Sequence, residues 1–131
     1  MGHIALLFYL RAVLNATVWD KHVRLVKSDE GKFFIMSKSS TKILQAVLKI
    51  KTLLTNPLLA NAFTFAGAGI EFGDVLLLPE DCFGDPVNVS SKLGEDTATD
   101  GQILVSQKCL KEIEVTEGKA FLDRKSTRLN S

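Results

Sequence analysis

The sequence predicts an α+β fold in which helices alternate with short strands. Apolar residues recur at helical spacing in two segments, which indicates helices. Short apolar runs, each bounded by glycine, proline or polar clusters, lie between and after these segments and indicate strands. The chain has 131 residues, which is enough for one domain, and its hydrophobic share of 46% is ordinary for a protein with a buried core. We therefore expect helices packed mainly on one face of a mainly antiparallel sheet.

A first helix is predicted over residues 3–19, because apolar residues recur there at helical spacing: Leu7, Leu10, Leu14 and Val18. A helix this apolar either packs into the core, which is the simpler interpretation, or contacts a partner. Two strands, 23–27 and 32–36, flank a polar cluster that ends in Gly31. Such a cluster between two apolar runs is typical of a β-hairpin.

A second helix is expected to start after Ser39 or Ser40, either of which can cap it, and to run to about Thr55. Its inner stripe comprises Ile43, Val47, Ile50 and Leu54, while Lys42, Lys49 and Lys51 face water. The dipeptide Asn56-Pro57 ends the helix, because a residue before proline disfavours helical geometry.

The second half of the chain continues the alternation. A strand over 62–71 contains the small residues Ala66 to Gly69, which allow close packing against a helix. The remaining predicted elements are a strand at 74–78, a helix within 81–96, a strand at 102–105, a helix over 107–112 capped by Ser106, and a strand at 113–121. An opening strand before the first helix would complete a ferredoxin-like sheet from this order.

The stretch DCFGDPVNVSSKLGED, residues 81–96, predicts a loop that leads into a helix with a phosphate-binding first turn. Asp85 is the expected N-cap, Pro86 suits the first helical position, and Gly94 can end the helix. Asn88 and Lys92 are four residues apart and project from one face near the positive end of the helix. An amide and a cation in this arrangement suit an anionic ligand.

This stretch also resembles class III adenylate and guanylate cyclase domains, whose corresponding helix follows the pattern G-x-x-V-N-x-A-[SA]-[RK]-L. The resemblance covers residues 2–112 and is strongest over 67–106, which includes GAGIEFGDVLLL, DCFGDPVNV and DGQILVS. The segment HVRLVKSDEGKFFIM is similar to the family's hairpin of the second and third strands. The resemblance implies that residues 1–122 form a partial cyclase domain, which lacks the first strand and the C-terminal hairpin of the cyclase fold.

The resemblance further implies conversion of ATP to cyclic AMP and pyrophosphate in intracellular signalling. In this reaction the ribose hydroxyl attacks the α-phosphorus, and charge on the phosphate oxygens must be neutralised. Carried over by position, Asn88 would orient the ribose and Lys92 would supply the transition-state cation. Asp81 would accept from the purine's exocyclic amine and Lys27 would donate to a ring nitrogen, which favours adenine. Without the motif, Asn88 would be an ordinary residue of the first helical turn and Asp81 a turn former. Lys27 and Lys92 would be surface lysines.

The metal ligands are where this sequence departs from the family. Members hold two Mg2+ or Mn2+ ions with two aspartates. One lies on a strand before the first helix, upstream of Met1, and the other falls at Gly31 in this chain. Asp29 or Glu30 could replace it only if the hairpin shifted register, so no metal ligand is assigned and the fragment alone is expected to be inactive.

The family builds its active site between two domains, so a second cyclase domain, in a homodimer, is the expected partner. The alternatives are a catalytically silent cyclase-homology domain that senses nucleotide or regulates a partner, and an unrelated ferredoxin-like interaction domain. A different strand order would favour the last of these.

Composition and the last residues of the chain complete the prediction. The net charge of +1 indicates neither nucleic acid nor membrane binding, and two cysteines agree with a cytoplasmic domain. Residues 123–131, DRKSTRLNS, resemble a translated sequencing adapter, although a short basic tail is the alternative. Without this segment 13 basic residues face 14 acidic ones, and the natural protein is expected to continue differently after Leu122.

Overall fold

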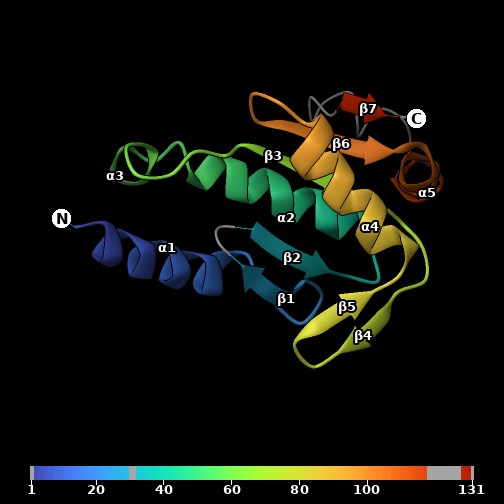
Figure 1. Cartoon of the computed structure of the whole chain (residues 1–131), viewed down its shortest axis with the longest axis horizontal. Coiled ribbons are helices and arrows are strands. Elements are labelled where there is room, and N and C mark those ends of the chain that lie inside the picture. The colour runs from blue at the N-terminus through green and yellow to red at the C-terminus, as the bar shows by residue number, and fades with distance from the viewer. Residues whose placement is uncertain (1, 30–31, 118–127, 131) are drawn as a thin grey trace.

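The computed structural model describes residues 2–29, 32–117 and 128–130, and the chain is a mixture of helices and short strands (Figure 1). The helices are α1 (His3–Thr17), α2 (Ser40–Leu53), α3 (Pro57–Ala60), α4 (Asp85–Lys92), the π-helical turn η1 (Leu93–Thr97) and α5 (Gln107–Glu117). The strands are β1 (Arg24–Asp29), β2 (Lys32–Met36), β3 (Gly67–Ile70), β4 (Leu76–Leu78), β5 (Asp81–Phe83), β6 (Gln102–Ser106) and β7 (Arg128–Asn130). None of the helices within these ranges has the length and apolarity needed to cross a bilayer.

The strands form three small sheets, whereas the sequence predicted one mainly antiparallel sheet. β1 pairs with β2 and β4 pairs with β5, both antiparallel, while β3, β6 and β7 pair in that order and run parallel. The parallel pairing has a topological cause, because helical segments connect β3 to β6 and a crossover of this kind returns the chain in the same direction. The expectation of a single antiparallel sheet is therefore wrong.

Helices pack on both faces of the β3–β6 ladder, and not mainly on one face as predicted. On one side Ala68 and Ile70 contact a core that α2 and α5 complete with Leu44, Val47, Cys109 and Ile113. On the other side Gly67 and Gly69 lie against η1 and α4. A Cβ on Gly69 would come within 2.2 Å of the Ser90 carbonyl oxygen. Glycine at this position thus sets how closely α4 crosses the strand.

A second core lies between α1 and α2. Leu10, Leu14 and Val18 are buried there, as their helical spacing predicted, whereas Leu7 is only partly buried and the helix ends at Thr17 instead of Trp19. The opposite side of α1 stays exposed, with Ile4 at 71% and Phe8 at 65% of their accessible surface. The helix therefore packs into the core along one side only.

Several predicted boundaries need correction. Ser39 caps α2 by accepting the Lys42 N–H at 3.2 Å, as predicted, but α2 ends at Leu53, and Asn56-Pro57 starts the short helix α3. The strand expected over 62–71 is shorter in the structure, where β3 covers only Gly67–Ile70. Residues 81–83 were predicted as a loop but form β5. Ser106 accepts the Cys109 N–H at 3.1 Å and caps α5, as predicted.

The C-terminal predictions fall partly on residues that lie outside the described ranges. α5 runs on to Glu117, so the strand predicted over 113–121 is wrong for residues 113–117, and residues 118–121 are not described. Arg128–Asn130, from the segment that resembles adapter sequence, form β7 against β6.

Candidate functional site

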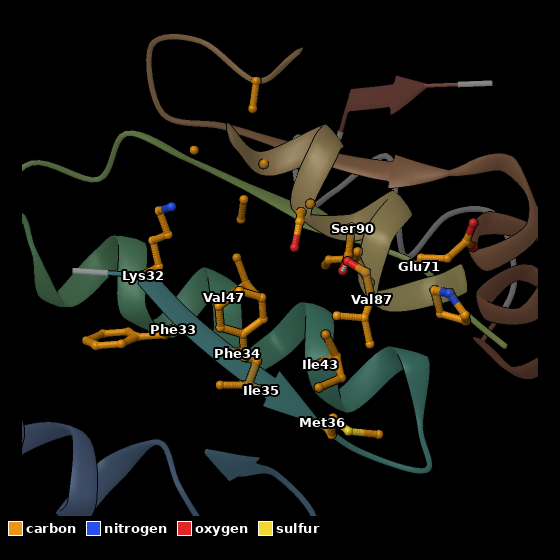
Figure 2. A pocket seen from close by; sticks show the side chains of 18 of the residues that line it. Lys32, Phe33, Phe34, Ile35, Met36, Ile43, Val47, Glu71, Val87 and Ser90 are labelled. Atoms are coloured by element: carbon orange, nitrogen blue, oxygen red, sulfur yellow. Dashed lines mark hydrogen bonds between the residues drawn. The ribbon is translucent and has the colours of Figure 1, made fainter. Parts of the chain in front are cut away.

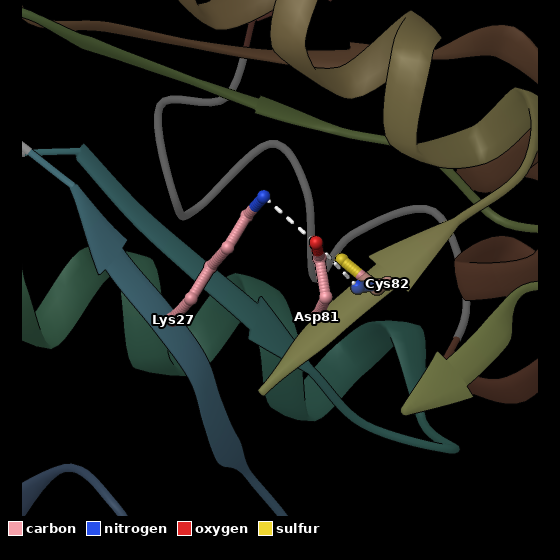
Figure 3. Close-up of polar contacts among 3 residues, drawn as sticks. All are labelled: Lys27, Asp81 and Cys82. Carbon is pink, nitrogen blue, oxygen red and sulfur yellow. Dashed lines mark hydrogen bonds and ion pairs between the residues drawn. The ribbon is translucent and has the colours of Figure 1, made fainter. Parts of the chain in front are cut away.

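The β4–β5 hairpin carries Asp81 to the side of the β1–β2 hairpin, although the two are far apart in the sequence. The Lys27 Nζ lies 2.8 Å from the Asp81 Oδ1 (Figure 3). Arg24 adds a second link, since its Nη2 donates to the Pro79 carbonyl at 3.0 Å. The structure thus brings together the two residues for which the sequence predicted purine contacts.

Both partners of this ion pair are held in position by further contacts. The Lys27 ammonium lies 4.8 Å from the centre of the Phe34 ring, on the strand paired with its own. The Asp81 carboxylate also accepts the Cys82 backbone N–H at 2.8 Å. The hydrogen bond from Lys27, supported by that from Cys82, lowers the pKa of Asp81 below its ordinary value. The side chains remain 35% and 37% exposed, so a ligand can reach them.

The start of α4 differs from the prediction by one residue. Gly84 is the N-cap, with a φ of 137° that favours glycine, and Asp85 is the first helical residue instead of the cap. Pro86 lies in the first turn, as predicted. Gly94 does not end the helix, because the chain continues into η1, where Gly94 packs against the backbone of β3.

Asn88 and Lys92 are both exposed on α4, so neither is covered by the core. Asn88 lies in the first turn, and its N–H donates to the Gly84 carbonyl at 3.2 Å. Lys92 lies in the last turn, so the expectation that both side chains project near the positive end is wrong for Lys92. A lysine there complements the negative end of the helix dipole. Within the described ranges no hydrogen bond or ion pair is found between these two residues and Lys27 or Asp81.

The described residues do not provide a set of ligands for a divalent metal ion. No group of three or more histidine, cysteine, aspartate or glutamate residues that could hold an ion occurs in the described part of the chain. Gly31 and Glu30 lie outside that part, and Asp29 stands opposite Lys32 in the hairpin register. We therefore assign no chemical step to a metal in this chain.

Cys82 lies next to Asp81, and it is only 5% exposed. Burial raises the pKa of its thiol above the ordinary value, while the Lys27 charge lowers it to a smaller extent. Cys82 is therefore a packing residue beside the ion pair.

A cavity of about 850 Å³ is lined by Phe34 and Cys82, the neighbours of the ion pair, but not by Lys27 or Asp81, and the sequence did not predict it. β2, α2, β3 and α4 line it, and Figure 2 shows Ile43 of α2 and Val87 of α4 directed toward the same space. Only the three-dimensional separation of β2 and β3 creates this cavity, so no local sequence signal could have indicated it. The Phe34 contact to Lys27 could have been predicted from the cross-strand register of the hairpin.

Comparison with protein-family models, with curated proteins and with solved structures gave no match.

Proposed function

We propose that this chain is part of a class III nucleotide cyclase domain that binds ATP, with Lys27 and Asp81 at the adenine edge. The supporting observation is their ion pair of 2.8 Å, formed by two distant segments that the resemblance had assigned to the same purine. A ferredoxin-like arrangement, with β1, β2 and β3 as three of its strands, belongs to the same proposal.

The chemistry of the pair suits adenine. Adenine presents an exocyclic amine, which donates, beside a ring nitrogen, which accepts. A carboxylate next to an ammonium matches these two atoms, and both are charged groups that strengthen a hydrogen bond. Guanine presents a carbonyl and a ring N–H at the corresponding positions. The carboxylate would then face an acceptor and the ammonium would face a donor, so neither hydrogen bond could form. The pair therefore favours ATP over GTP.

The exposed side chains of α4 and of the neighbouring hairpin extend the proposal to the triphosphate and to a partner. Asn88 and Lys92 would contact ribose and phosphate, with lysine acting as a point charge. Apolar side chains are exposed on the hairpin that carries Asp81, with Leu76 at 62% and Phe83 at 49%. Exposed apolar surface beside a site is typical of an interface, which supports a second cyclase domain as the partner, in a homodimer. The proposal also places the domain in the cytoplasm.

A second candidate is a silent cyclase-homology domain that binds nucleotide without turnover. Gly31 favours it, because glycine stands where the family has its metal-binding aspartate. The two candidates share the adenine contacts, and they differ in whether the complete domain forms product.

The test is titration of the isotopically labelled chain with ATP and, separately, with GTP, followed by NMR. We expect ATP to shift the resonances of residues 27, 81 and 88 and to bind more tightly than GTP. Asp81→Asn should weaken ATP binding by about tenfold, on the order of one charge-assisted hydrogen bond. An assay with Mn2+ and ATP should give no cyclic AMP from the chain alone.

The matched control is the other described ion pair, between Lys32 and Glu95, whose Nζ and Oε1 are 3.3 Å apart. Glu95→Gln removes a surface carboxylate of similar exposure without touching the proposed adenine contacts, and it should leave ATP binding unchanged. Equal losses in both variants, or no shift with ATP, would contradict the proposal. Product formed by a longer form of the protein would exclude the silent candidate.

A further inference from the structure

The β1–β2 hairpin contains a β-bulge immediately before Lys27. Leu25 stands opposite Ile35 in the register of the two strands. The next pair is Lys27 with Phe34, so Val26 is an extra residue in β1. A register change of one residue moves the following side chains to the other face of the sheet, and bulges often direct a side chain in this way next to a binding site. The bulge therefore determines the direction of the Lys27 side chain.

The two faces of this hairpin have different surroundings. Successive side chains of a strand point to opposite faces, so Phe33 and Phe34 point apart. Phe33 packs against the core between α1 and α2, where its ring meets that of Trp19 edge to face, with the centroids 6.3 Å apart. An unbroken register would put Lys27 opposite Phe33 and direct its charge toward that core, which is costly. With the bulge, Lys27 stands opposite Phe34 and reaches Asp81 (Figure 3).

The Phe34 ring holds the ammonium that the bulge brings to this face. The Lys27 Nζ lies 4.8 Å from the centre of the ring, within the range of cation–π attraction. The two other contacts between a lysine ammonium and a phenylalanine ring in the described part of the chain are longer, 5.9 Å each. A lysine side chain is flexible, and an ion pair this exposed does not fix it alone. The ring therefore limits where the ammonium can lie.

We propose that the Val26 bulge and the Phe34 ring together position the Lys27 ammonium for the purine edge, and that Phe34 thereby determines specificity for adenine. Phe34 acts through Lys27, so it is a positioning residue. An ammonium fixed beside the Asp81 carboxylate keeps donor and acceptor in the order that adenine requires, whereas a freely moving ammonium could also turn to the carbonyl of guanine. The inference rests on the proposed function for its ligand, but the positioning itself is measurable without nucleotide.

The first measurement uses the isotopically labelled chain without nucleotide, followed by NMR. We expect the Lys27 methylene protons next to Nζ to be shifted upfield by the Phe34 ring and to show nuclear Overhauser effects to its ring protons. Overhauser effects to the Phe33 ring instead, or methylene shifts typical of an unfolded chain, would overturn the proposal.

Three variants then test specificity in titrations with ATP and, separately, with GTP. Phe34→Leu removes the ring but keeps an apolar side chain. It should cancel the upfield shift of Lys27, weaken ATP binding about two- to fivefold, and lower the ratio of ATP to GTP affinity by a similar factor. Phe34→Tyr keeps an aromatic ring and should restore both the shift and the ratio. Phe33→Leu is the matched control, because it removes the neighbouring ring on the core side, and it should lower stability without changing the shift or the ratio.

This inference and the proposed function fail in different ways. ATP binding with an unchanged ratio in Phe34→Leu, or an equal loss of the ratio in Phe33→Leu, would overturn the inference and leave the proposed function in place. An unmodified chain that binds neither nucleotide would contradict the proposed function and, with it, the role of Phe34 in specificity. If Phe34→Leu fails to fold, the methylene shifts and Overhauser effects of the unmodified chain decide.

Discussion

At the scale of single residues, the Lys27–Asp81 pair is better explained by positioning than by stability. An ion pair with more than a third of each side chain exposed contributes little to stability, because water screens it and two side chains lose freedom. Yet Lys27 is also held by the Phe34 ring, and Asp81 by the Cys82 N–H. Contacts that orient a weak pair so closely are useful when a ligand must meet both groups at once.

The lowered pKa of Asp81 gives a prediction for acid unfolding. Because the pKa in the folded chain is below that of the unfolded chain, about 3.9, the stabilisation is present above that pH and is lost as the pH falls through the folded value. We expect the urea midpoint to fall as the pH drops below about 4, and Asp81→Asn to reduce this dependence.

Carbon NMR of the Asp81 carboxyl measures the same pKa directly. In Lys27→Met it should move back toward the ordinary value, since the largest cause of the shift is removed while the Cys82 hydrogen bond stays. A carboxyl pKa that does not respond to Lys27→Met would show that the ion pair does not form in solution.

At the scale of secondary-structure elements, α4 is positioned by glycine contacts with β3. A Cβ on Gly69 would meet the Ser90 oxygen at 2.2 Å and the Gly94 nitrogen at 2.6 Å, and one on Gly94 would meet the Gly69 nitrogen at 3.0 Å. The two glycines thus allow helix and strand backbones to approach without side chains between them. Asn88 and Lys92 owe their place on the surface to this crossing.

Gly69→Ala should therefore be strongly destabilising. Backbone atoms of α4 and η1 would have to move, and overpacking of this kind costs about 1–3 kcal/mol. Urea unfolding of this variant should show the loss, together with shifted amide resonances along α4. Gly2→Ala is the control, because no atom lies within 4 Å of a Cβ there, and its stability should stay within about 0.5 kcal/mol. A Gly69→Ala protein as stable as this control would show that α4 does not pack on β3 as described.

The same elements show how far the sequence could lead. Hydrophobic periodicity and capping residues located α1, α2 and α5, and the hairpin signal located β1 and β2, because these depend on neighbours in the chain. The sequence could not indicate that η1 would extend α4 past Gly94. This glycine is explained by close packing against the backbone of β3, and not by a helix end. It also missed β5, a three-residue strand that depends on pairing with β4, and the parallel order of β3, β6 and β7.

The candidate site was predictable to a similar degree. The placement of Lys27 beside Asp81 followed from the resemblance, and the structure brings the two together. The position of Lys92 in the last turn of α4 was missed, because it depends on where the helix starts, and Gly84 instead of Asp85 provides the cap. The cavity was missed as well, because it arises from two strands that remain apart.

At the scale of the whole molecule, two surfaces in the described part of the chain carry most of the exposed large apolar side chains, while Leu58, Phe72, Val89 and Val115 lie elsewhere. One is the outer side of α1, with Ile4, Phe8 and Tyr9. The other is the β4–β5 hairpin, with Leu76, Leu77, Leu78 and Phe83. Only the hairpin adjoins the candidate site, since Asp81 begins β5. A partner that completes the site would therefore be expected on the hairpin and not on α1.

Self-association should accordingly depend on the hairpin. Leu78 and Leu58 are both 44% exposed, but Leu78 lies on β4 and Leu58 on the remote helix α3, so Leu78→Lys and Leu58→Lys form a matched pair. Burying one leucine in an interface contributes about 1.5–3 kcal/mol, and replacing it with a charge should weaken a dimer by about tenfold or more. Analytical ultracentrifugation over a range of concentrations should show this loss for Leu78→Lys and little change for Leu58→Lys. Equal weakening by both substitutions, or a monomer at every concentration in the unmodified chain, would remove the hairpin as a contact between copies and with it the homodimer from the proposed function.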